Sequence, residues 1–267
     1  MTAGQHVVCA SAGNFGQVMA YAGKGAFHPR DGVRRARRQS EQGGADAEPG
    51  SRGRPGGWGL RRGQGRGPAF AGTRPEYVFV EDGDEPLIAE GAGTIAVELA
   101  PLGLDALLVP VGNGALISGI GCWTKARSPR TRIIGVCAAG APAMATSWRT
   151  GVPEATGPVS TMADGIAVRV PMPAAVGWIR EVVDDVLLVD EEDIRLALRI
   201  VRDTMGLFLE PSGAVGITAA LRHDLGAASL GTVLTGGNFS PALLGELAPD
   251  PSRAEGPASP AADQRAR

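Results

Sequence analysis

The sequence is poor in aromatic residues, in cysteine and above all in lysine. Aromatic side chains make up 4% of the 267 residues, and the only lysines are Lys24 and Lys125. The three cysteines, Cys9, Cys122 and Cys137, lie far apart, without a CxxC pair or a histidine at metal-ligating spacing. This pattern argues against a disulfide framework or a zinc-finger type of site, and it predicts free, buried thiols in a reducing compartment.

Long hydrophobic runs are also absent. No apolar stretch approaches the roughly 20 residues of a membrane-spanning helix, and the N-terminus lacks a basic segment followed by an apolar one. We therefore expect a cytoplasmic protein without a membrane partner. The net charge of −2 gives no overall reason to expect nucleic acid as a partner. A hydrophobic content of 43% is ordinary for a globular protein of one large or two smaller domains.

The clearest local pattern is the stretch ALLVPVGNGALISGIG at positions 106–121. Apolar, strand-forming residues run from Ala106 to Val111, a Gly112-Asn113-Gly114 turn follows, and a helical pattern begins at Ala115. The free N–H groups of a helix's first turn favour an anion such as phosphate, and glycines allow it to approach closely. A glycine turn of this kind can also serve only to reverse the chain.

The composition changes between positions 25 and 76. Residues 28–76 contain eleven arginines, twelve glycines and only two large aliphatic residues, and they carry a net charge of +6, against −8 for the rest of the chain. A segment with so few apolar side chains cannot offset the entropy that ordering it would cost. We therefore expect no packed secondary structure here.

Three interpretations of this Arg/Gly segment compete. Residues 50–68 resemble arginine-glycine segments that bind RNA through phosphate pairing and base stacking. The segment could instead be an inert flexible loop. It could also be the translation of a GC-rich stretch in the wrong reading frame, which yields mainly Arg, Gly, Pro and Ala. Composition favours the frame error, and nucleic acid is the weakest of the three.

Three further motifs flank predicted strands and helices. SAGNFGQ, at positions 11–17, follows a short apolar strand and begins a helix. EPSGA, at positions 210–214, follows the helix that Asp190 begins and Gly206 ends. TGGN, at positions 235–238, follows a final strand predicted at residues 232–234. Taken alone, Ser11 and Asn14 could be a helix cap, and Glu210 could be a cap or a partner of the helix dipole.

Together, SAGNFGQ, GNGAL, EPSGA and TGGN resemble, in order and separation, the pyridoxal-phosphate enzymes of fold type II, especially the serine/threonine dehydratases. The resemblance covers residues 7–24 and 77–247. It implies a doubly wound α/β fold with parallel sheets and two domains, with the cofactor between them at the strand ends. The family's N-terminal part is expected to be missing here.

The resemblance also implies a domain organisation. Residues 1–24 and 77–90 are expected to be remnants of the smaller domain, interrupted by the Arg/Gly segment at 25–76. Residues 91–247 are expected to form the larger, cofactor-binding domain, and residues 248–267, rich in Pro, Ala and charge, a disordered tail. By the same resemblance we expect a homo-oligomer.

Site roles follow from the family in the same way. The substrate carboxylate is expected at Ser11, Ala12, Gly13, Asn14 and Gln17. The cofactor is expected to contact Asn14 through its ring oxygen, Thr235 through its ring nitrogen, and Gly112, Asn113, Gly114, Ala115 and Leu116 through its phosphate. Some members use the glutamate of the EPSGA motif for a divalent cation, which here would be Glu210.

The implied reaction is the deamination of L-threonine or L-serine to a 2-oxo acid and ammonia. It requires a lysine that carries pyridoxal 5'-phosphate and acts as a base. The family's lysine motif lies before the SAGN loop, where this sequence has none, and Lys24 and Lys125 are predicted to be surface residues. We expect little or no catalysis by the chain. The alternatives are a catalytically inactive remnant or partner subunit of the fold, and an RNA-binding protein that uses the Arg/Gly segment.

Overall fold

The computed structural model describes residues 6–9, 14–26, 71–72, 75–238 and 240–248. The expectations for Ser11, Ala12 and Gly13, for almost all of the Arg/Gly segment and for the tail from 249 onward lie outside these residues.

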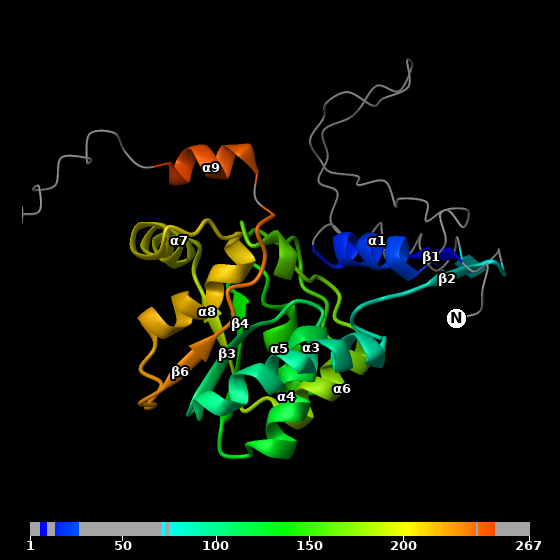
Figure 1. The fold of residues 1–267 in the computed structure, drawn as a ribbon, viewed down its shortest axis with the longest axis horizontal. Coiled ribbons are helices and arrows are strands. Elements are labelled where there is room, and N and C mark those ends of the chain that lie inside the picture. The colour runs from blue at the N-terminus through cyan, green and yellow to red at the C-terminus, as the bar shows by residue number, and fades with distance from the viewer. Residues whose placement is uncertain (1–5, 10–13, 27–70, 73–74, 239, 249–267) are drawn as a thin grey trace, which may run out of the picture.

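Four parallel strands form the larger sheet, in the order β5-β4-β3-β6 (Figure 1). The strands are β3 (Ala106–Pro110), β4 (Arg132–Ala138), β5 (Asp185–Val189) and β6 (Leu230–Thr232). Every pairing is parallel, and Ala106 of β3 is aligned with both Arg132 and Leu230. All of β3 is buried, as its uninterrupted apolar sequence predicts for a strand covered on both faces.

Helices cover both faces of this sheet (Figure 1). They are α3 (Pro86–Leu99), α4 (Ala115–Arg127), α5 (Ala143–Thr150), α6 (Pro173–Val182), α7 (Glu191–Met205) and α8 (Pro211–Arg222). Helix α9 (Pro241–Leu247) contacts α7. Ala106 and Leu108 of β3 pack on the side of α7 and α8, whereas Leu107 and Val109 pack on the side of α3, α4 and α6. The doubly wound parallel fold predicted from the sequence is thus confirmed.

A second, smaller sheet contains β1 (His6–Val8) and β2 (Tyr77–Phe79), paired in parallel and accompanied by α1 (Asn14–Ala26). These elements lie to one side of the larger sheet (Figure 1). The predicted domain boundary between residues 90 and 91 falls inside α3, which packs along α4. The division into two domains stays a prediction.

Most predicted strands and helices are present, with small differences at their ends. The last strand is Leu230–Thr232 rather than residues 232–234. After Thr232 the chain leaves the sheet to pack on α8, where a Cβ placed on Gly213 would lie 1.9 Å from the Thr235 carbonyl oxygen. Gly206 ends α7 with a left-handed φ of 67°, as expected. Asp190 precedes α7, but its side chain makes no capping hydrogen bond.

Helices α3 and α4 approach each other through Gly93 and Gly119. A Cβ added to Gly119 would lie 1.8 Å from the carbonyl oxygen of Ala89. We expect Gly119→Ala to lower the free energy of unfolding by about 3 kcal/mol, because backbone atoms must separate. Gly91→Ala is the control: it adds a methyl group in open space on α3 and should be neutral or stabilising by up to about 1 kcal/mol. Urea unfolding curves of both variants test this, and equal curves would contradict the contact.

Among the helices in the described ranges, none has both the length and the apolar composition that a membrane span needs.

Candidate active site

The turn between β3 and α4 leads into a helix whose first turn has no side-chain cap. Gly114 precedes α4 with a left-handed φ of 95°, makes no side-chain cap, and no acidic residue stands in the helix's first turn. The Ser118 N–H bonds the Gly114 carbonyl oxygen at 2.9 Å, so the N–H groups of the three preceding residues have no intrahelical acceptor. These donors and the positive end of the helix dipole therefore remain for a ligand.

The glycines of this turn are closely surrounded. A Cβ on Gly112 would lie 3.2 Å from the Gly165 carbonyl oxygen, and one on Gly114 would lie 3.2 Å from the Ala175 Cβ and would also require a left-handed backbone. Larger residues at either position would have to displace the loop before α6 or α6 itself. The turn is therefore fixed by packing.

Asn113 connects this turn to the acidic turn after β2. Its Nδ2 donates to Asp82 Oδ1 at 2.6 Å and to Glu81 Oε1 at 3.3 Å. Glu81 is only 9% exposed. Burial, and then the charge of Asp82 and a hydrogen bond with it, raise the pKa of Glu81 to about 7.

Glu210 joins the first and last predicted motifs of the site. The Asn14 Nδ2 donates to Glu210 Oε1 at 2.8 Å, and the Asn238 N–H donates to Glu210 Oε2 at 3.1 Å. Glu210 is 5% exposed and precedes α8, but its side chain does not cap that helix. One carboxylate therefore brings together the SAGN, EPSGA and TGGN motifs.

Gly236 allows this arrangement. Its φ is 80°, and a Cβ there would lie 2.0 Å from Glu210 Oε1 and 2.6 Å from the Asn14 Nδ2. Burial raises the pKa of the Glu210 carboxyl, and the two hydrogen bonds from Asn238 and Asn14 partly oppose that rise. The neighbouring Ser212 hydroxyl, beside Gly165, is buried and has no hydrogen-bond partner among the residues that the structure describes. A polar atom without a partner at this position is available to a ligand.

Comparison with known proteins identifies the family of the chain. Residues 2–236 match the profile of the family described as "Pyridoxal-phosphate dependent enzyme". The chain belongs to this family. The resemblance drawn from the four motifs is therefore confirmed, as is pyridoxal phosphate as the family's cofactor.

Relatives within this pyridoxal-phosphate family are amino-acid enzymes. An L-threonine ammonia-lyase of Geobacter sulfurreducens is 39% identical over 61% of this chain and 41% of its own length. The human serine racemase is 34% identical over 61% of this chain and 50% of its own length. The chain therefore spans about half, or less, of these curated relatives.

Solved structures agree on the fold. A threonine deaminase of T.th. superposes with a TM-score of 0.69 at 26% identity, over 90% of this chain and 79% of its own. A maize serine racemase superposes with a TM-score of 0.62 at 27% identity, over 70% of this chain and 58% of its own. The fold is therefore that of the fold type II pyridoxal-phosphate enzymes.

The residues of this family member fit a pyridoxal phosphate. The uncapped first turn of α4 offers donors for the phosphate, and the Asn14 amide and the unpartnered Ser212 hydroxyl offer polar contacts for the ring. The individual roles assigned to the site residues all stay predictions, both at the β3–α4 turn and in the SAGN and TGGN motifs.

The cation predicted at Glu210 also stays a prediction. Within the described ranges there is no group of three His, Cys, Asp or Glu side chains that could hold a metal ion. The two oxygens of Glu210 are already engaged by Asn14 and Asn238.

Lys125 lies away from these residues. Its Nζ pairs with Asp184 Oδ2 at 2.6 Å, and the same oxygen accepts the Ile133 N–H at 2.6 Å. We expect Lys125→Met to lower the free energy of unfolding by no more than about 1 kcal/mol, because the pair is partly exposed, and to leave cofactor binding unchanged. Urea unfolding and a binding titration test this. Loss of binding would place Lys125 in the site.

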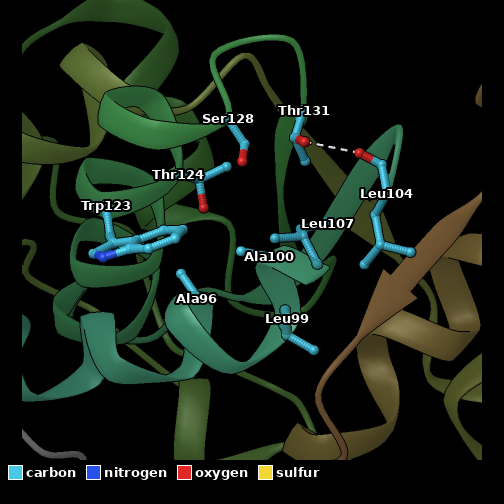
Figure 2. A pocket seen from close by; sticks show the side chains of 9 residues that line it. All are labelled: Ala96, Leu99, Ala100, Leu104, Leu107, Trp123, Thr124, Ser128 and Thr131. Carbon is cyan, nitrogen blue, oxygen red and sulfur yellow. Dashed lines mark hydrogen bonds between the residues drawn. The ribbon is translucent and has the colours of Figure 1, made fainter. Parts of the chain in front are cut away.

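A small pocket lies at the other end of β3 (Figure 2). It is lined by Leu99, Trp123 and Thr131 among others, and the Thr131 hydroxyl closes one side by donating to the Leu104 carbonyl oxygen at 2.8 Å. Because Leu104 precedes β3 and Asn113 follows it, this pocket is separate from the candidate active site.

Proposed function

We propose that the chain carries the cofactor and amino-acid site of a pyridoxal-phosphate lyase that deaminates L-threonine or L-serine to a 2-oxo acid and ammonia. The observation that supports this most is the Glu210 carboxylate, which joins Asn14 and Asn238 across 196 and 28 residues of sequence. The relatives named L-threonine ammonia-lyase and serine racemase support the same substrate class. We also propose that the protein is cytoplasmic and forms a homo-oligomer, as expected from the sequence.

The protein's own residues have distinct tasks in this proposal. The first turn of α4 binds the phosphate, and Thr235 donates to the ring nitrogen. Glu210 orients the Asn14 amide toward the ring oxygen, and residues 11–13 with Gln17 bind the substrate carboxylate. Pyridoxal phosphate, when bound, supplies an electron sink for the Cα of the amino acid. A neutral hydroxyl at the ring nitrogen would leave that nitrogen largely unprotonated.

The proposed reaction also needs a lysine that removes the Cα proton. Neither of the two lysines in the sequence is assigned to the site, so we propose that the chain binds cofactor and substrate with little turnover of its own. A small primary amine can take the place of a missing lysine, because it supplies the same nitrogen base from solution.

Amine rescue tests the proposed function. The chain is incubated with pyridoxal phosphate, methylamine and L-threonine or L-serine, and the 2-oxo acid is measured. We expect amine-dependent 2-oxo acid above the rate of the same mixture without protein, and a loss of that excess in Glu210→Ala. A rate equal to that without protein would contradict the proposal.

Two alternatives are separated by the same preparation. A non-catalytic partner subunit would bind cofactor but show no rescue with any amine. The RNA-binding alternative depends on residues outside the described ranges, and the structure adds nothing to it. It predicts salt-sensitive RNA binding that disappears when residues 50–68 are deleted.

A further inference from the structure

The acidic turn after β2 packs directly against the turn that faces the phosphate. A Cβ on Gly83 would lie 2.9 Å from the Asn113 carbonyl oxygen and 3.2 Å from the Asn113 Cβ. The Asn113 amide adds its two hydrogen bonds to Asp82 and Glu81. The position of the Gly112–Gly114 turn therefore depends on the acidic turn, through backbone packing and through one side chain.

This contact concentrates negative charge. Glu81, Asp82 and Asp84 stand within four residues. Burial, and then the charges of Asp82 and Glu81, raise the pKa of the Cys9 thiol, which directly follows β1. Within the described ranges no lysine or arginine forms an ion pair with any of the three carboxyl groups. A phosphate bound at the start of α4 would thus be close to carboxyl groups that no lysine or arginine of the described ranges neutralises.

A proton shared by Glu81 and Asp82 would lessen this conflict. Glu81 and Asp82 are hydrogen-bonded to each other, and the Glu81 side chain of this pair is buried. With the proton bound, the pair carries one negative charge and both groups can hold the Asn113 amide. Without it, two adjacent carboxylates face the turn that must receive a phosphate, and repulsion opposes binding.

We propose that Asn113 is a positioning residue that connects the Gly112–Gly114 turn to Glu81 and Asp82, so that a proton shared by these two carboxyl groups strengthens phosphate binding at that turn. This inference rests on the proposed cofactor site. Burial and Asp82 place the pKa of Glu81 at about 7, so the proton is lost near neutral pH. Affinity for the phosphate is therefore high below pH 7 and falls as the pH rises through it.

The test uses pyridoxine 5'-phosphate, which has no aldehyde to react with amines, and pyridoxine as the matched ligand without phosphate. Dissociation constants are measured by calorimetry from pH 6.5 to 8.5. If bound phosphate raises the pKa of the pair by about one unit, the affinity of the wild-type chain falls by up to about tenfold over this range.

Three variants and one control separate the parts of the proposal. Glu81→Gln removes the titrating carboxyl and should give pH-independent binding. Asp82→Asn should move the fall in affinity to lower pH, because burial alone still raises the pKa of Glu81. Asn113→Gly removes the contact and should weaken binding at pH 6.5 and flatten the pH profile. Asp84→Asn is the control, because it removes a charge from the same turn without a contact to Asn113. It should keep the pH dependence, with the midpoint moved slightly to lower pH, because the charge of Asp84 also helps to raise the pKa of Glu81.

The possible results are distinct. Circular dichroism first shows which of Glu81→Gln and Asp82→Asn are folded. A wild-type dissociation constant that does not change with pH would overturn the role of the proton. The same holds if a folded variant has the same pH profile as the wild type. An unchanged profile in Asn113→Gly would overturn the role of Asn113. Equal binding of pyridoxine 5'-phosphate and pyridoxine at every pH would instead contradict the proposed phosphate site.

Discussion

Borohydride reduction of the chain with pyridoxal phosphate is expected to fix no cofactor at a specific lysine, and 2-oxobutanoate formation from L-threonine is expected to be at least about 100-fold below that of a lysine-bearing relative. The reason is the placement of the two lysines. Lys125 is paired with Asp184. Lys24 lies ten residues along α1 from Asn14, which corresponds to about 15 Å of helix.

The control for this prediction is the double variant Lys24→Arg, Lys125→Arg, which keeps both charges but leaves no lysine side chain. It should bind pyridoxine 5'-phosphate as the wild type does and should form 2-oxobutanoate at the same low rate. The reduced wild-type protein is digested and mapped by mass spectrometry. A single phosphopyridoxyl peptide that contains Lys24 or Lys125, together with activity lost in the double variant, would show that one of them serves the site.

Replacement of Glu210 by alanine is expected to have the second large effect. It leaves the Asn14 amide and the Asn238 N–H without their acceptor in a largely buried position, which costs about 3 kcal/mol of unfolding free energy. Cofactor binding should weaken as well, because Asn14 loses its orientation. Urea unfolding and titration with pyridoxine 5'-phosphate measure the two losses separately.

Gly236→Ala should disrupt the same contact between Glu210 and Asn14. Its methyl group would lie 2.0 Å from Glu210 Oε1, so it must displace the carboxylate and should reproduce the loss seen in Glu210→Ala. Gly237→Ala is the matched control, since nothing lies within 4 Å of its added Cβ. If the two glycine variants unfold at the same urea concentration, the Glu210 contact does not contribute as described.

A pH profile adds an independent check on Glu210. Burial raises the pKa of this carboxyl in the folded chain, so folding favours its protonated form. The part of its contribution to stability that depends on protonation is therefore present in full at low pH and is lost as the pH rises through the folded pKa. Glu210→Gln, which cannot ionise, should lack this part of the pH dependence.

The local pattern of the sequence was enough to predict the fold around the Gly112–Gly114 turn. The apolar run of β3, the Gly112–Gly114 turn and the start of α4 at Ala115 are all read from neighbouring residues. Gly206 at the end of α7 is a signal of the same kind. These features depend on backbone propensity and periodicity, which are local properties.

The contacts that define the site could not be predicted in this way. Asn14 and Glu210 are 196 residues apart, and Asn113 and Asp82 are 31 apart, so neither spacing suggests a hydrogen bond. The family resemblance assigned Glu210 to a cation, and its place before a helix suggested a cap or a partner of the helix dipole. Its actual partners follow from tertiary packing. The raised pKa of Glu81 likewise arises mainly from burial, and no sequence motif indicates that this side chain is buried.

The most direct test of the account is whether the first turn of α4 recognises a phosphate. Leu116, in that turn, is replaced by glutamate and, as the matched neutral control, by glutamine, and each protein is titrated with pyridoxine 5'-phosphate and pyridoxine at pH 6.5. The account predicts that wild type and Leu116→Gln prefer the phosphorylated ligand and that Leu116→Glu loses this preference, because a carboxylate there repels the phosphate. Equal preferences in Leu116→Glu and Leu116→Gln would contradict it.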